Sequence, residues 1–469
     1  MAIKRYIADA DTTITNAFKT NLTTRATGSN MGEADAVEIF RIYAQASSGS
    51  GEISRALFKF PVSTINTDRN NGDLPASGSV SFYMRLFNAK HPFTLPRNFD
   101  LTIQAVSRSW SEGTGLDLDN YSDTGYANWI AASSGSSGEV QWATEGGDYH
   151  TSPEYTAHFD RGYEDLEANI TPLVEQWIAG TKENYGVGVF LSSSIENALS
   201  SSYTKKFFAR GSEFFYRRPI IEARWDSSIK DDRTNFWSSS SLASSADNLN
   251  TIYLYNVIRG RFANIPEVGT GSIYLQIWTE PATGSLLTPT PITGGYVSTG
   301  IYSASFALNT TESYVYDRWF GPGLTTVYHT GSIKVKQQNS SDFNPNKRYV
   351  VSMPNLKDYY STEEVARFRV FTRPRNWCPN IYTKATAEIE PGIIEDLYYR
   401  FKRIPDDLTV IDYGTGSENS TRLSYDASGS YFDLDVSLLE PGYAYQISFI
   451  FNDGGIYREQ TEHFKIRVD

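Results

Sequence analysis

The chain has 469 residues, enough for about three domains that each bury a core of their own. It carries 42 Lys and Arg residues against 54 Asp and Glu residues, and the net charge of −12 argues against a nucleic-acid binder, which needs a basic face. Apolar residues make up 40%, which excludes a wholly disordered chain, and the single cysteine, Cys378, excludes an intrachain disulfide and a thiolate zinc cluster.

The composition favours an all-β protein. Aromatic residues make up 14% of the chain, with 31 Tyr and 26 Phe, and these residues favour pleated, half-buried strands that the 35 Gly residues would separate by turns. The segment from Met1 to Tyr6 lacks the apolar stretch of a signal peptide, and no run of 18 apolar residues occurs. We therefore expect a protein made without Sec export and without a membrane-spanning segment.

Residues 1–226 are interpreted as the first domain. Residues 54–60 alternate apolar and polar side chains, as a strand on a core does. One short helix is predicted from Thr171, a good N-cap, followed by Pro172 at the first helical position and ended by Gly180. Its apolar stripe consists of Leu173, Val174, Trp177 and Ile178.

Six segments of this domain occur in a recognisable order. They are Arg55 to Phe60 (R-A-L-x-x-F), Trp110 to Gly115 (W-x-E-G-x-G), Trp142 to Asp148 (W-x-x-x-G-G-D), Val174 to Gly180 (V-x-x-W-x-x-G), Asn184 to Gly186 (N-Y-G) and Pro219 to Ile221 (P-x-I/L). Together they resemble the DNRLRE-type β-sandwich domains, a jelly-roll-like family found beside carbohydrate-active and surface proteins. The resemblance implies a jelly-roll-like sandwich for residues 1–226. The long Ser- and Gly-rich insertion from Ser133 to Gly138 departs from the family pattern.

The remainder of the chain predicts two smaller, immunoglobulin-like β-sandwiches after a Ser-rich linker at residues 227–245. In the middle sandwich, residues 246–338, Ile273, Leu275 and Ile277 alternate with polar or aromatic neighbours, which is the period of a strand. In the C-terminal sandwich, residues 339–469, the stretches at 397–404, 431–436 and 464–468 alternate in the same way. Residues 361–364 mimic a helix capping box, but the stretch from Val365 to Phe371 alternates like a strand, and we favour the strand.

An acidic loop and three tryptophans are the candidate ligand sites of the first domain. Asp117, Asp119 and Asp123 could gather oxygen ligands around calcium, although the calcium-hand pattern is not met and a solvated acidic loop is the favoured alternative. Three tryptophans could stack on sugar rings, namely Trp110, Trp129 and Trp142; for Trp110 and Trp142 the favoured alternative is a place in the core or as anchors of the loops. Three further acidic residues could line the same edge of the sandwich: Glu112, Glu145 and Asp148.

Motifs for catalysis are missing from the sequence. It contains no phosphate-binding loop, no H-E-x-x-H pair and no G-x-S-x-G elbow. The five histidines are scattered and are interpreted as polar loop residues: His91, His150, His158, His329 and His463. Paired carboxylates for glycoside hydrolysis remain an alternative, because their spacing in space does not follow from sequence. We expect a protein that is not an enzyme and has no cofactor, calcium excepted.

The layout of the whole chain resembles virion structural proteins of tailed bacteriophages, especially of marine myophages. The resemblance lies around Asn376-Trp377, Ile394-Glu395, Tyr413 to Gly416 and Leu438 to Gly442. It implies a tail, neck or capsid accessory subunit in the virion, packed against copies of itself and other virion proteins, with no nucleic-acid or membrane partner. The alternative is a polysaccharide-binding appendage or adhesin, whose first domain would be the carbohydrate-binding module for a host-surface polysaccharide.

Overall fold

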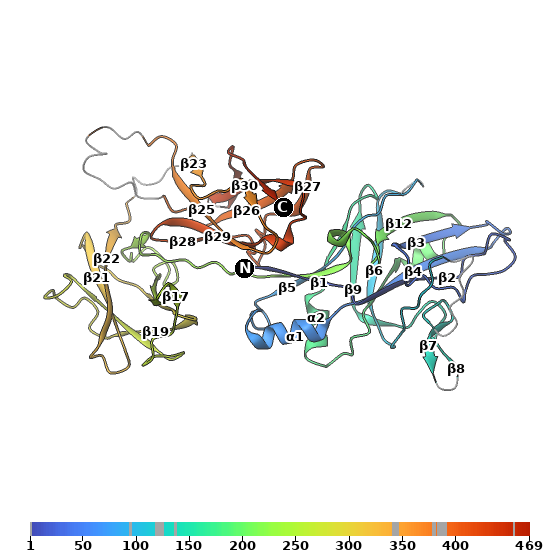
Figure 1. Cartoon of the computed structure of the whole chain (residues 1–469), viewed down its shortest axis with the longest axis horizontal. Helices are drawn as coiled ribbons and strands as arrows, with labels where there is room; N and C mark the ends of the chain where they lie inside the picture. The colour runs from blue at the N-terminus through green and yellow to red at the C-terminus, as the bar shows by residue number, and fades with distance from the viewer. Residues whose placement is uncertain are drawn as a thin grey trace. The chain divides into compact units, whose positions relative to one another are not determined.

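The computed structural model describes residues 2–92, 96–117, 126–135, 138–339, 347–377, 381, 392–453 and 455–469. In this part the chain folds mainly into β-strands, which confirms the predicted all-β class (Figure 1). The chain divides into two compact units, residues 2–226 and residues 227–469. The division falls where the sequence predicts the end of the first domain.

The first unit is a sandwich of two antiparallel sheets. The smaller sheet has the order β1-β13-β5-β10, with strands Ile3–Ile7, Ile220–Arg224, Ser81–Leu86 and Leu166–Asn169. The larger sheet has the order β12-β3-β4-β11-β6-β9, with strands Ser202–Phe208, Ala36–Tyr43, Gly51–Lys59, Val187–Leu191, Phe99–Val106 and Tyr149–Phe159. Strand β2 (Ala10–Thr15) also pairs with β4, and β7 (Ala131–Gly135) with β8 (Gly138–Gln141) forms a separate hairpin.

The core of the first unit lies between these two sheets. Phe82 and Met84 of β5 face it from the smaller sheet, and Phe58 of β4 faces it from the larger one. Each alternate residue along these strands is fully buried, because successive side chains of a strand point to opposite faces. Burying each of these large apolar side chains contributes about 1.5–3 kcal/mol. The period-two pattern at residues 54–60 is therefore confirmed.

Helices cover part of this unit, and the sequence predicts only one of them. Helix α2 (Thr171–Ile178) buries Leu173, Val174 and Trp177 as expected, but its N-cap is Ile170 rather than Thr171. The Thr171 hydroxyl instead accepts a hydrogen bond from the backbone N–H of Phe82, so it joins the helix to β5. Helix α1 (Val62–Asn71) lies beside α2 (Figure 1), and α3 (Ser193–Glu196) and the 3-10 turn Phe215–Arg217 are short.

Helix α1 was not predicted, because its sequence has no apolar stripe. Of its ten residues, only Val62 and Ile65 are buried. A bidentate ion pair helps to hold it: the Arg69 guanidinium donates to both carboxylate oxygens of Glu175 on α2, at 2.8 and 2.7 Å. Tertiary contact thus supplies what local propensity does not.

The middle module of the second unit is one curled sheet. Its order is β14-β22-β21-β18-β19-β20-β15, with strands Phe236–Trp237, Val327–Lys336, Tyr314–Phe320, Ile273–Trp278, Ile292–Ser298, Ile301–Phe306 and Asn250–Tyr255. Its two end strands meet, because the side-chain amide of Asn250 accepts from the backbone N–H of Trp237 at 2.8 Å and donates to its carbonyl at 2.9 Å. The predicted core residues Ile273, Leu275 and Ile277 are fully buried inside.

The segment predicted as a Ser-rich linker is instead built into the second unit. The backbone of Ile229 and that of Asp231 exchange hydrogen bonds with Tyr425 in the C-terminal module. Arg233 forms a bidentate ion pair with the fully buried Asp317 of the middle module, at 2.8 Å for both bonds. Residues 236–237 then form β14, so the composition of this stretch misled the prediction of flexibility.

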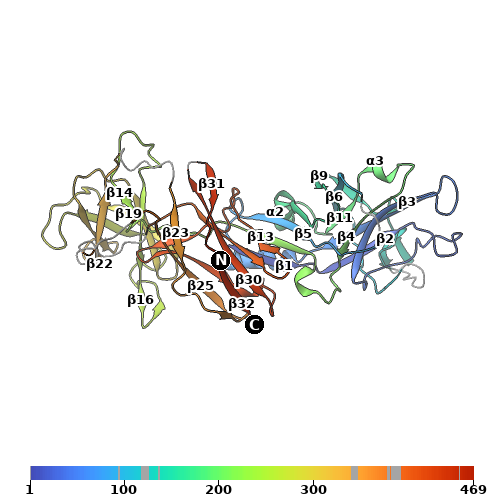
Figure 2. The ribbon, with the colours of Figure 1, turned by 90° about the horizontal axis from the view of Figure 1, so that it is seen from above.

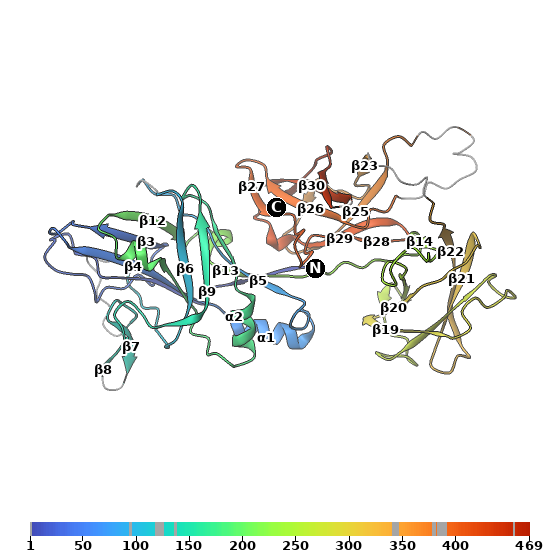
Figure 3. The ribbon, with the colours of Figure 1, turned by 180° about the vertical axis from the view of Figure 1, so that it is seen from behind.

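The C-terminal module is a sandwich of two sheets (Figure 3). One sheet has the order β23-β25-β29-β28, with strands Tyr349–Ser352, Val365–Pro374, Gly429–Asp435 and Ser424–Asp426. The other has the order β24-β32-β30-β26-β27 with β31 paired to β30, and comprises Tyr359–Tyr360, Phe464–Val468, Ala444–Asp453, Leu397–Arg403, Leu408–Ile411 and Ile456–Glu459. A short 3-10 turn, Val436–Leu438, follows β29.

Aromatic rings from both sheets fill the core of this sandwich. Phe432 of β29 stacks on Phe368 of β25 at 5.0 Å between ring centroids and on Tyr399 of β26 at 4.1 Å. The strand interpretation of Val365 to Phe371 is confirmed by β25. The predicted strands at 397–404, 431–436 and 464–468 are also present, as β26, β29 and β32.

Candidate binding site

The motif loops of the first unit form a second small core on the outer face of the larger sheet. Strand β4 is buried on both faces, and Leu57 contacts this second core while its neighbours face the first. Trp110, Trp129 and Trp142 lie in it and are only 5–7% exposed. The indole N–H of Trp110 donates to the carbonyl of Tyr185 at 2.7 Å. Buried rings offer no face to a sugar, so packing describes all three tryptophans, as the favoured alternative has it for Trp110 and Trp142.

The glutamate of the W-x-E-G-x-G loop ties that loop to two other segments. The Arg210 guanidinium donates to both oxygens of the Glu112 carboxylate, at 3.1 and 2.7 Å. The backbone N–H of Asp11 on β2 also donates to Glu112, at 2.7 Å. Glu112 is therefore an anchor of the loop, which explains its place in the motif.

Asp11 is an unusual member of this cluster, because its side chain is fully buried. One of its carboxylate oxygens accepts from the backbone N–H of Arg210, while the other, Oδ1, has no hydrogen-bond partner in the described residues. Burial raises the pKa of Asp11 to about 7; the Glu112 charge adds to this, and Arg210 opposes it.

The aspartate of the W-x-x-x-G-G-D loop closes its own turn. Asp148 accepts from the backbone N–H groups of Ala143 and Thr144, at 2.9 and 3.0 Å, and pairs with Arg108 at 3.1 Å. Glu145 is exposed beside it. Glu112 and Asp148 are thus engaged in different contacts and do not form one carboxylate site with each other.

The predicted calcium loop falls mostly outside the described residues. Asp117 is described, whereas Asp119 and Asp123 are not, and Cys378 also lies outside. Within the described ranges, no group of three His, Cys, Asp or Glu side chains could hold a metal ion. Calcium binding by this loop stays a prediction.

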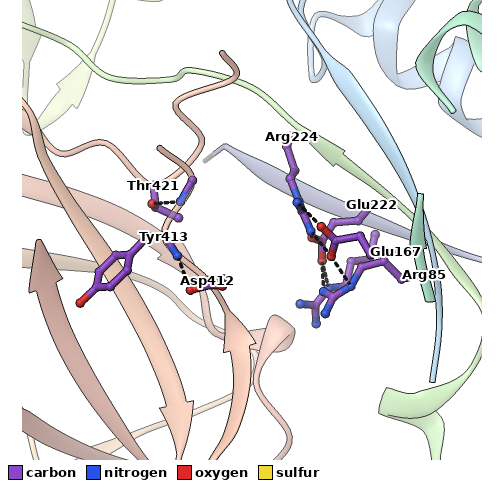
Figure 4. Close-up of polar contacts among 9 residues, drawn as sticks. Arg85, Glu167, Glu222, Arg224, Asp412, Tyr413 and Thr421 are labelled. Carbon is purple, nitrogen blue, oxygen red and sulfur yellow. Dashed lines mark hydrogen bonds and ion pairs between the residues drawn. The ribbon is translucent and has the colours of Figure 1, made fainter. Parts of the chain in front are cut away.

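A cluster of charged side chains crosses the smaller sheet of the first unit (Figure 4). The Glu222 carboxylate on β13 accepts from Arg5 at 2.7 Å, Arg85 at 3.0 Å and Arg224 at 2.7 Å. Arg224 also forms a bidentate pair with Glu167 on β10, at 3.0 and 2.9 Å. Burial by itself would raise the pKa of Glu222, but the three guanidinium groups outweigh it and hold that pKa far below its usual range. The cluster joins all four strands of the smaller sheet, as a structural ion-pair network does.

The histidines lie apart from one another, and three of them are on strands rather than in loops. His150 and His158 lie near opposite ends of β9, and His329 lies on β22. His158 pairs with Asp100 at 2.7 Å, and this hydrogen bond raises its pKa. Of the five histidines, only His329 lines one of the two clefts described below.

That cleft opens in the middle module and has a volume of about 360 Å³. The residues with polar or aromatic groups in its lining are Tyr255, Asn256, Glu267, Tyr328 and His329. Opposite the end of β21 the register of β22 shifts, since Trp319 pairs with His329 and Phe320 with Val327. Tyr328 is the extra residue of this bulge, and both Tyr328 and His329 line the cleft. No local sequence signal indicates that Glu267, Tyr328 and His329 line the same cleft.

Exposed apolar side chains surround the same end of the module. The hairpin of β16 (Val257–Ile258) and β17 (Arg261–Phe262) projects from its body (Figure 2), and Ile258, which precedes the turn of the hairpin, lines the cleft. The neighbouring β19–β20 turn is joined to it, since the N–H of Asn256 donates to the carbonyl of Gly300 at 2.7 Å. The apolar tip, as we call this surface, consists of residues that are 37–53% exposed: Val257, Ile258, Phe262, Tyr296 and Val297.

A second cleft, of about 410 Å³, lies in the first unit between α2 and the end of β4. Its charged lining residues are of both signs: Asp9, Lys59, Lys182 and Glu183. Burial raises the pKa of Asp9, and Lys59 opposes this. The mixed charges do not single out a ligand class.

Comparison with known proteins adds little to this description. No family model and no curated protein matches the chain. Among solved structures, the chain is similar to the adhesin InvE of Yersinia pseudotuberculosis, with 11% sequence identity over 50% of this chain and a TM-score of 0.17. The similarity spans 56% of the adhesin chain and is too slight to support a functional argument. Among the described residues, no helix is long and apolar enough to cross a membrane.

Proposed function

We propose that this chain is a non-enzymatic structural protein of a tailed bacteriophage particle, a tail, neck or capsid accessory subunit that acts by packing against other subunits. The observation that carries the proposal is the apolar tip. Large apolar side chains gathered on a projecting hairpin are typical of surfaces that another protein covers. The resemblance to virion proteins, described from the sequence, supplies the kind of assembly.

The engagement of the motif residues in folding contacts supports a role without catalysis. Glu112, Asp148 and Glu222 each accept several hydrogen bonds from their own unit, as scaffold residues do. A scaffold that is repeated around a symmetric particle needs a rigid body and a contact surface, and many identical contacts add up through effective concentration.

The direct test is the protein inventory of purified particles. Mass spectrometry of intact particles should find this chain at a fixed copy number. A chain that is abundant in infected cells but missing from particles would overturn the proposal.

A pair of variants tests the apolar tip within the same system. Phe262→Asp places a charge on the tip, and we expect it to reduce incorporation into particles at least tenfold. Leu242→Asp is the matched control, because Leu242 is 96% exposed in the same unit but is not part of the tip. Equal incorporation of both variants would show that the tip is not the contact surface.

A further inference from the structure

We propose that the cleft of the middle module binds an uncharged saccharide. This inference goes beyond the packing role and does not depend on it. It rests on three polar groups that meet in a cleft with aromatic and apolar walls. The tryptophans that the sequence suggested for this purpose lie in the other unit and are buried.

Glu267 is the centre of the site. Its Oε2 accepts a hydrogen bond of 2.6 Å from the hydroxyl of Tyr328, and its Oε1 has no partner in the part of the chain that the structure describes. The bond to Glu267 raises the pKa of Tyr328 to about 12, so the tyrosine remains a donor at neutral pH. The carboxylate is thus held in place with one oxygen available to accept from a ligand hydroxyl.

His329 provides a second polar group. It is exposed, and its imidazole makes no hydrogen bond with any described residue. Partial burial lowers its pKa, and Arg233 adds to this while Asp317 opposes it, so the ring is neutral at pH 7. A neutral imidazole offers one donor and one acceptor, which matches the hydroxyl groups of a sugar.

The walls suit the apolar face of a sugar ring. The aromatic rings of Tyr255 and Tyr328 line the cleft together with the aliphatic side chain of Ile258. Tyr255 is held by Phe262, whose ring centroid lies 6.4 Å away. A cleft of about 360 Å³ lies within the range of small-molecule sites, which begins at roughly 300 Å³.

Charge decides between ligand classes. The described lining holds the acidic residue Glu267 and no Lys or Arg, so a phosphate or an acidic sugar would meet a carboxyl group without a basic side chain. A lipid tail would cover Oε1 of Glu267 and the imidazole of His329 without offering either a hydrogen-bond partner, which is costly. An uncharged sugar satisfies the polar groups and covers the rings.

Titration calorimetry on the full chain tests the proposal. The probes are di- and trisaccharides of glucose, galactose, mannose and N-acetylglucosamine at millimolar concentration, beside sialylated and phosphorylated counterparts. We expect at least one neutral probe to bind and its charged counterpart to bind at least tenfold more weakly. Failure of all neutral probes, or equal binding of the charged ones, would overturn the proposal.

Two variants place the binding in this cleft. Glu267→Gln and Tyr328→Phe should each weaken binding about tenfold, and the second keeps the ring if the first disturbs folding. Glu312→Gln and Tyr314→Phe are matched controls, because both residues are exposed in the same module outside the cleft. Binding that survives both cleft variants unchanged would rule out this site.

Discussion

The guanidinium of Arg210 holds the carboxylate of Glu112 through two hydrogen bonds of 3.1 and 2.7 Å, although the two residues are 98 positions apart in the chain. This pair fixes the W-x-E-G-x-G loop against the segment that follows β12. The Glu112 carboxylate also receives the N–H of Asp11, so one side chain joins three segments.

Replacing Glu112 by Gln should therefore destabilise the first unit. The variant keeps the size of the side chain but loses the charge that strengthens its bonds, and we expect a loss of about 1–3 kcal/mol in the free energy of unfolding. Urea denaturation followed by tryptophan fluorescence measures it. Glu145→Gln, an exposed neighbour in the next motif loop, should change stability by less than about 0.5 kcal/mol. Equal effects of the two variants would contradict the anchoring role.

Asp11 should make the first unit less stable as the pH rises. Its pKa is about 7 in the folded chain and about 3.9 in an unfolded one, so the folded state holds the proton more tightly. The stability that this proton provides is complete below pH 4 and is lost between about pH 4 and 7. Asp11→Asn should remove this dependence and raise stability at pH 8 by roughly 1–4 kcal/mol. Hydrogen exchange of the β2 amides across this range reports the effect, and an unchanged pH profile in the variant would refute it.

The Glu222 cluster should have the opposite pH dependence and make the first unit less stable as the pH falls. Three guanidinium groups hold the pKa of Glu222 below its value in the unfolded chain, about 4.3, so its contribution is present above that value and is lost as the pH falls below it. Glu222→Gln removes the carboxylate that all three arginines share, although Arg224 and Arg85 keep their pairs with Glu167, and should cost about 3–5 kcal/mol at pH 7.

Thermal unfolding at pH 7 and pH 3.5 checks this expectation, since the gap between the wild type and Glu222→Gln should narrow at the lower pH. Glu213→Gln is a control in the same unit, because Glu213 is exposed. A gap that stays constant between the two pH values would show that the charge of Glu222 is not the stabilising feature.

Two glycines of the motifs should differ sharply in their tolerance of a methyl group. Gly186 of the N-Y-G turn has a φ of +82°, and a Cβ there would lie 2.0 Å from the carbonyl oxygen of Phe58. Gly180, after α2, has a φ of +68° but open space around it. Gly180→Ala should cost about 1–2 kcal/mol from backbone strain alone, whereas Gly186→Ala also meets a clash and should cost about 4 kcal/mol or more. Melting temperatures of the two variants provide the comparison, and similar values would contradict the clash.

Local patterns predicted a strand well where one of its faces is buried and the other is not, because the period of two is then visible in the sequence. Ile273, Leu275 and Ile277 are the clearest case, with three alternating residues fully buried. Helix α1 could not be predicted in this way, since its stability depends on the pair of Arg69 with Glu175, 106 positions away. The segment at 227–245 was misjudged because serine composition says nothing about pairing with distant strands.

The candidate cleft could not be predicted from the sequence for a different reason. Glu267 and Tyr328 are 61 positions apart, and Tyr255 and Tyr328 belong to β15 and β22, which are not neighbours in the sheet. The bulge at Tyr328 has no sequence mark of its own, being neither glycine nor proline. The tryptophans of the motif loops stood out because they are rare residues beside glycine turns, yet that placement reflects packing.

The side-chain amide of Asn250 spans the seam between β14 and β15. A strand edge with unsatisfied backbone groups can recruit a strand from another molecule and so start aggregation. Asn250 forms hydrogen bonds with both the N–H and the carbonyl of Trp237, so these two backbone groups are not available to a strand from another molecule. Asn250 should therefore protect this seam from strand exchange between copies of the chain at high concentration.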